Sequence, residues 1–226
     1  MTRKFPPIIL FLTVFAVLGH SYSDPEWDPV VYSGTFFVLL EDSDPLDPHL
    51  YDEDEAITRL LEEARWVFSS MIYGFRFEYV PSDVARAVEE EFRLDQVHQI
   101  PWGDPGLSVS GGRYEGGIYY ADISYKVNED QIPWVHSWET NILSDIISSG
   151  GGSLFSGLDG KIESIRNTVK QALRDYLRPR IYDKPRKVSG TGRLSSVPTY
   201  AMTAGEYRCK AGVTIDFDEI LEYRIY

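Results

Sequence analysis

Four basic residues follow one another at intervals of four along a predicted helix and its continuation. They are Arg166, Lys170, Arg174 and Arg178. This spacing places side chains on one helix face, and a row of positive charge attracts phosphate or carboxylate groups. This set, called the basic stripe below, suits anionic lipid headgroups, lipopolysaccharide or an acidic protein. The alternative is a solvated helix face that balances acidic charge elsewhere in the chain.

Aromatic residues form a second candidate binding set. Trp102, Trp134 and Trp138, together with Tyr114, lie in or near segments rich in glycine and proline, which we expect to be loops. Loops carry function more often than core elements do, and exposed aromatic rings stack on sugars or hold a peptide. Trp134 and Trp138 are four residues apart, so the alternative is that they pack beneath their own loop.

The sequence predicts no catalytic residue, metal ligand or cofactor. Cys209 falls on the apolar side of an alternating strand pattern, and a thiol buried among apolar groups is inert because burial disfavours the thiolate. The histidines beyond the N-terminal segment, His49, His98 and His136, have none of the spacings of metal sites. No motif for a nucleophilic serine or for a phosphate-binding loop is present.

Acidic residues leave two options open. The segment Glu41–Asp54 offers carboxylate ligands for calcium, but it lacks the residue order of an EF-hand, and a solvated loop explains it equally. Paired carboxylates could also serve a glycan hydrolase. With 35 aspartates and glutamates in the chain, however, some pair always exists, so no particular pair is selected.

The N-terminus has the pattern of a secretory signal peptide. Arg3 and Lys4 precede the apolar run Ile8–Leu18, and small residues at 21 and 23 mark a cleavage site before Asp24. The run is shorter than the roughly 20 residues of a membrane-spanning helix. We therefore expect residues 1–23 to be removed, and the mature chain to be periplasmic or secreted rather than integral to the membrane.

Charge is unevenly distributed along the chain, whose formal net charge is −13. Residues 24–160 carry 27 acids and 7 bases, whereas residues 161–226 carry 13 bases and 8 acids. The acidic body would repel a phosphate backbone, so nucleic acid is not an expected partner. The basic block instead suggests an anionic envelope component or a protein partner.

Hydrophobic periodicity predicts the elements that would position these residues. We expect strands over 30–40, 75–79 and 117–127, helices over 55–73, 82–92 and 161–177, and further strands after 187, with turns at 190–192 and 204–205. Residues 132–157 are interpreted as irregular apart from a short helix over 142–147. Their last part, a Gly/Ser-rich tract around Gly150–Gly152, is interpreted as a flexible joint or a tight loop.

Two segments resemble each other within the chain. Residues 116–130 and 206–220 both alternate apolar and polar residues, and the pairs Ala121 with Ala211 and Ile123 with Val213 align. Each segment also follows an amphipathic helix. We therefore consider an internal helix–strand duplication, although any two half-buried strands share such alternation.

These patterns together predict an α+β fold: one antiparallel sheet with two main amphipathic helices on one face. Residues 24–226 would form a single domain, with possible halves 24–149 and 158–226. The expected function is binding or scaffolding in the cell envelope, and the alternative is an exported hydrolase that acts on glycans.

Overall fold

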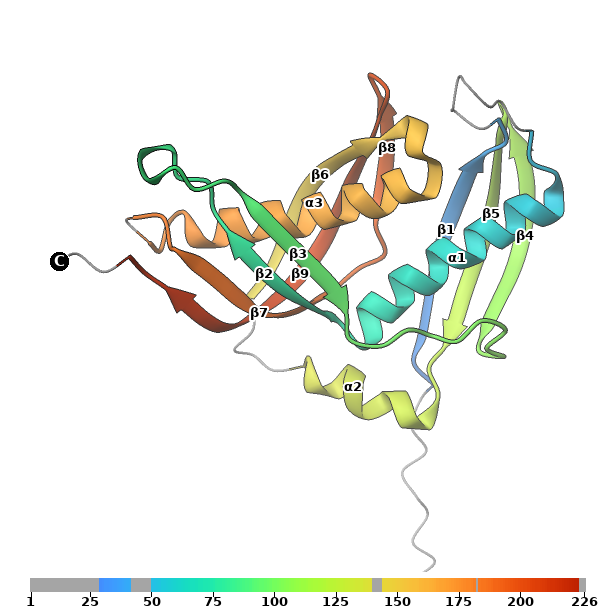
Figure 1. The fold of residues 1–226 in the computed structure, drawn as a ribbon. Coiled ribbons are helices and arrows are strands. Elements are labelled where there is room, and N and C mark those ends of the chain that lie inside the picture. The colour runs from blue at the N-terminus through green and yellow to red at the C-terminus, as the bar shows by residue number, and fades with distance from the viewer. Residues whose placement is uncertain (1–28, 42–49, 140–143, 182, 224–226) are drawn as a thin grey trace, which may run out of the picture.

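The computed structural model describes residues 29–41, 50–139, 144–181 and 183–223 (Figure 1). The signal segment and most of the acidic loop lie outside these residues. The fold is α+β, as the sequence predicted. The strands form two antiparallel sheets, however, where the sequence predicted one.

The smaller sheet has the order β1-β5-β4, and the larger has the order β3-β2-β7-β9-β6, with β8 also pairing with β9. The strands are β1 (Val31–Leu39), β2 (Phe75–Val80), β3 (Glu91–Gln96), β4 (Leu107–Glu115), β5 (Ile118–Lys126), β6 (Ser144–Ser153), β7 (Lys187–Leu194), β8 (Thr199–Thr203) and β9 (Glu206–Leu221). The helices are α1 (Glu53–Ile72), α2 (Ile132–Ser137) and α3 (Gly157–Leu177), with short 3-10 turns at Val84–Arg86, Glu129–Gln131 and Leu154–Ser156.

Helix α1 begins and ends where its sequence predicts. Asp52 accepts a hydrogen bond from the backbone of Glu55 at 2.9 Å, and the Glu55 carboxylate accepts one from the backbone of Asp52 at 3.2 Å, which confirms the capping box. Gly74 follows the helix with a positive φ of 75°, a conformation that glycine adopts without strain. The helix packs on the smaller sheet through Phe68, whose ring contacts Phe36 of β1 and Tyr125 of β5.

Helix α3 lies unusually close to β6, and glycines make this possible. A Cβ atom added to Gly150 would lie 2.8 Å from the backbone oxygen of Ser164, and one added to Gly152 would lie 2.8 Å from the backbone nitrogen of Ser164. The interpretation of this Gly/Ser tract as a flexible joint is therefore wrong. It is a regular strand that pairs with β9 from Ser144 to Ser153, and its glycines serve packing.

The two sheets and the two long helices share one hydrophobic core. Buried side chains from α1, α3, β1, β2, β5, β7 and β9 belong to a single cluster. Figure 1 shows α1 lying along the smaller sheet and α3 crossing the larger one. The core therefore links the two halves of the chain rather than separating them.

The topology supports the internal duplication. Strand β1 precedes α1 and pairs with β5, which in turn pairs with β4; strand β6 precedes α3 and pairs with β9, which in turn pairs with β8. The aligned residues occupy matching places, because Ala121 lies opposite Phe36 of β1 and Ala211 lies opposite Ser148 of β6. In this comparison β6 is the counterpart of β1, and it starts at Ser144, before the Gly/Ser-rich tract that the sequence suggested as a joint.

Three local predictions are wrong. The helix expected over 82–92 is a short turn followed by β3, and Val84, expected inside, is 94% exposed. The segment 132–157 contains α2 and β6 instead of irregular structure with a helix over 142–147; residues 140–143 lie outside the described residues. The turn expected at 190–192 is the middle of β7, whereas the turn at 204–205 is confirmed.

Within the described part of the chain, no helix combines the length and the apolar character needed to cross a membrane.

Candidate functional site

A groove of about 490 Å³ runs beside the C-terminal half of α3. Its floor and walls come from the end of β2, the residue before β3, α3 itself and the segment after α3. The apolar part of the lining consists of Tyr79, Pro81, Leu177, Ile181 and Pro185. The polar part consists of Ser82, Glu90, Gln171, Arg174, Asp175, Arg178, Asp183 and Lys184. An open, partly apolar groove with converging polar groups is typical of a ligand site.

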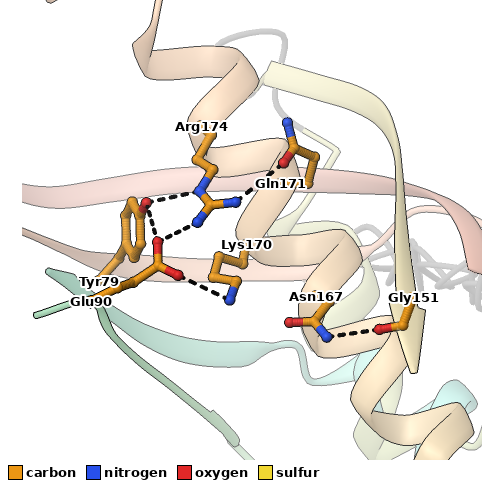
Figure 2. A network of polar contacts seen from close by, with 7 residues as sticks. All are labelled: Tyr79, Glu90, Gly151, Asn167, Lys170, Gln171 and Arg174. Carbon is orange, nitrogen blue, oxygen red and sulfur yellow. Dashed lines mark hydrogen bonds and ion pairs between the residues drawn. The ribbon is translucent and has the colours of Figure 1, made fainter. Parts of the chain in front are cut away.

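A network of polar contacts holds one wall of this groove in place (Figure 2). Arg174 donates from Nε to the hydroxyl of Tyr79 at 2.9 Å and also bonds Glu90. The Tyr79 hydroxyl donates to the same carboxylate at 3.0 Å, and Lys170 completes the set at 3.2 Å. The guanidinium of Arg174 is therefore held in one orientation before any ligand arrives.

The same contacts set the ionisation of the network. Burial alone would raise the pKa of Glu90, but the hydrogen bonds from Arg174, Tyr79 and Lys170 outweigh it and lower that pKa. Burial raises the pKa of Tyr79, although its hydrogen bond with Arg174 opposes the change. Near neutral pH the groove thus holds a charged carboxylate, a charged guanidinium and a neutral phenol.

The structure divides the basic stripe. Lys170 and Arg174 both pair with Glu90, so two of the four charges share one carboxylate. Arg178 lines the groove and, within the described residues, forms no ion pair. Arg166 is exposed and does not line the groove. The stripe is thus part exposed helix face and part groove wall, and its role in binding stays a prediction.

The aromatic set does not form one site. Trp102 is 55% exposed, and Arg65 stacks on its ring. Trp134 contacts the rings of Tyr73 and His98 at the surface. Trp138 packs instead against the backbone turn at Gly74, which belongs to another segment and not to its own loop.

Tyr79, Glu90 and Lys184 were missed as site residues. Tyr79 followed the alternation of a half-buried strand and therefore looked like a core residue. Glu90 fell inside the segment misread as a helix, and Lys184 was counted only as part of the basic block. No local pattern marks Tyr79 and Glu90, because strand pairing within the larger sheet brings them to α3 from positions far away in the sequence. Lys184 lies in the segment that follows α3.

A second polar cluster is buried between the two helices. Lys161 of α3 and Glu63 of α1 are 3% and 2% exposed, and their charged atoms are 2.6 Å apart. Lys161 also donates to the backbone oxygen of Phe37 in β1, whose ring centre lies 3.8 Å from the ammonium group. Burial lowers the pKa of Lys161, although the charge of Glu63 opposes the change.

The remaining chemical candidates give no second site. Cys209 is buried, as predicted, and burial raises the pKa of its thiol to about 11. Within the described residues, no three side chains of His, Cys, Asp or Glu are grouped as metal ligands would be. The calcium option for the acidic loop falls mostly outside these residues.

Comparisons with known proteins place the chain in a family. No solved structure matches it significantly. A protein of Treponema pallidum (strain Nichols), described as uncharacterized, is 24% identical over 167 residues, which cover 74% of this chain and 70% of that protein. A protein-family model whose description names no activity matches residues 30–223, and the chain therefore belongs to that family.

Proposed function

We propose that this protein is exported and acts by binding, without catalysis, an anionic component of the cell envelope in the groove beside α3. The negatively charged group of the ligand contacts the basic wall, and an apolar part of the ligand lies against Tyr79, Leu177 and Ile181. Export rests on the signal-peptide pattern of residues 1–23, and the mature protein is periplasmic or secreted.

The unpaired guanidinium of Arg178 is the observation that carries this proposal. The groove is lined by three cations, Arg174, Arg178 and Lys184, and by three carboxylates, Glu90, Asp175 and Asp183. The lining is therefore charge-balanced in a protein whose formal net charge is −13, and Arg178 has no carboxylate partner within the described residues. An anionic ligand would supply that partner.

Glu90 does not have the ionisation that a glycosidase needs in its proton donor. A glycosidase needs one carboxylic acid whose raised pKa keeps a proton available for the leaving group. The pKa of Glu90 is lowered instead, because cations and a phenol stabilise its charged form. This carboxylate is therefore suited to orient Arg174 rather than to donate a proton.

Reversing the charge of Arg178 should weaken binding of an anionic amphiphile. With dodecyl phosphate as the probe, below its micelle concentration, we expect Arg178→Glu to raise the dissociation constant at least about tenfold, which corresponds to roughly 1.4 kcal/mol. Isothermal titration calorimetry measures this constant. Arg166→Glu is the matched control, because it makes the same charge change on the same helix outside the groove, and it should change binding less than about twofold after correction for salt.

Two results would contradict the groove proposal. One is equal weakening by both substitutions, which would indicate a general charge effect. The other is no measurable binding of the probe by the native protein, which would remove the evidence for an anionic amphiphile.

Export has a separate test. When the full chain is expressed in a bacterial host, mass spectrometry of the protein from the envelope fraction should show an N-terminus at Asp24. Leu12→Arg interrupts the apolar run, so this variant should stay in the cytosol with residues 1–23 intact. An uncleaved native chain in the cytosol would disprove export and leave the groove proposal to be judged by its own titration.

A further inference from the structure

Strand β6 ends the larger sheet, and one of its edges faces away from β9. Its ladder with β9 runs from Ser144 to Ser153 without a register shift. Within the described residues, no strand pairs with the outer edge. A regular unpaired edge of this length presents backbone donors and acceptors to any extended chain that can reach it.

The other edge strands are shorter, interrupted or covered, whereas β6 is not. Strand β8 has only five residues, β3 is short and carries Glu91, Arg93 and Asp95, and β4 is interrupted by a bulge between Ser110 and Arg113. The edge of β1 is covered where Lys161 bonds the oxygen of Phe37. Charges, bulges, proline and covering side chains are the usual protections of an edge. From Ile146 to Ser153, the sequence of β6 contains no charge and no proline.

Alternation along β6 determines which groups face outward. The oxygen of Gly151 accepts a hydrogen bond from the Asn167 side chain at 2.8 Å (Figure 2), whereas the nitrogen of Leu154 bonds Gly205 next to β9. Because the hydrogen-bonding direction alternates in an antiparallel strand, the backbone groups of Ile147 and Ser149 point to the outer edge. The Asn167 side chain does not cover these two residues, so they form the open part of the outer edge of β6.

The side chains beside this open part have two different characters. Ile147 is 71% exposed and lies opposite Gly212 of β9, which offers no side chain to cover it. On the helix side, Ser148 bonds Asp175 at 3.1 Å, and within the described residues no cation pairs with that carboxylate. A depression of about 550 Å³ joins these features and is lined by Ile147, Ser148, Ser149, Gln171, Asp175 and Lys210.

The position of α3 argues against a second copy of the chain as the occupant. Antiparallel pairing of two β6 strands would place both α3 helices on the same face of a continuous sheet. Neighbouring strands are about 4.8 Å apart, whereas packed helices need about 8–10 Å. Because α3 lies directly over β6 and its Asn167 side chain reaches the edge, two such helices would collide. A single extended peptide has no helix and fits.

We propose that β6 binds an extended peptide by strand addition, and that the peptide alternates basic and aliphatic residues. Its backbone pairs with Ile147 and Ser149. Its aliphatic side chains lie beside Ile147 on one face, and its basic side chains face Asp175 on the other. This site adjoins the proposed ligand groove, because the two depressions share Gln171 and Asp175 as lining residues.

The test uses a short acetylated peptide in which lysine and valine alternate. Fluorescence anisotropy of a labelled copy gives its dissociation constant for the native protein. We expect Ile147→Lys to weaken binding at least about tenfold, because it places a charge on the open edge. Asp175→Asn should weaken it about threefold, since the isosteric amide keeps the shape but loses the charge. Val84→Lys, a matched change at another exposed position, should leave binding unchanged.

Backbone pairing has its own readout. Binding of the peptide should slow amide hydrogen exchange at Ile147 and Ser149, as measured by NMR, and the same peptide with every amide N-methylated should not bind. Failure of the alternating peptide to bind, or binding without protection of those two amides, would overturn the proposal. Protection that appears without peptide as protein concentration rises, and that Ile147→Lys abolishes, would overturn it in favour of a second copy.

Discussion

Replacing Gly152 with valine should destabilise the protein by at least about 3 kcal/mol. The new Cβ would lie 2.8 Å from the backbone nitrogen of Ser164, and the backbone oxygen of Gly160 is closer still. Both neighbours are helix backbone, so no side chain can rotate away. Relief requires α3 to move off β6, which opens the core between them. For a chain of this length, the melting temperature should fall by roughly 6–12 °C or more.

Gly151→Val is the matched control, because it makes the same change at the next residue of the same strand. A Cβ there meets only the side chains of Glu206, at 3.1 Å, and Arg208, and both can move. Its cost should stay below about 1 kcal/mol. Urea unfolding followed by tryptophan fluorescence measures both variants. If they lose equal stability, close approach of helix and strand is not the reason for glycine at position 152.

The strands and helices that have one apolar face and one polar face were predictable from the sequence. A capping box and an apolar face predict helix α1, and the alternation of apolar and polar residues predicts β5 and β9. The same pattern failed for β3, where charged residues occupy the outward positions of a short edge strand and Phe92 fits a helical spacing as well as a strand. A one-dimensional pattern cannot distinguish these states when the element is short and partly exposed.

Glycine at positions 150 and 152 shows a different limit. Composition alone associates consecutive glycines with flexibility. In this fold they are required because a helix passes within contact distance of the strand backbone. That requirement arises from tertiary packing between β6 and α3, so no property of the tract itself could reveal it.

Only the part of the candidate groove that α3 contributes was predictable from the sequence, for a related reason. Arg174 and Arg178 were found because they lie on one helix face. Tyr79 and Glu90 reach that face only through the pairing of β2 with β7, a contact that links residues more than a hundred positions apart. Sequence periodicity identifies faces of elements, but it does not identify which faces meet.

Replacing Lys161 with methionine should cost about 3–5 kcal/mol, because it leaves the carboxylate of Glu63 buried without a cation. Glu63 has little other support: its Oε1 atom has no hydrogen-bond partner within the described residues. The pair also joins α1 to α3 and to the edge of β1, so its loss weakens the contact between the two long helices. Urea unfolding followed by tryptophan fluorescence gives the change in free energy.

The double variant Lys161→Met/Glu63→Leu separates the cost of an unpaired charge from the value of the pair itself. Replacing both charges with apolar side chains removes the desolvation penalty of each, so the double variant should recover most of the lost stability and return to within about 2 kcal/mol of the native protein. Lys170→Met is the control for an accessible pair, since Lys170 and Glu90 are partly solvated, and it should cost less than about 1 kcal/mol. A double variant as unstable as Lys161→Met would show that the ion pair contributes net stability of its own. Recovery would instead show that the pair adds little net stability over an apolar contact between α1 and α3.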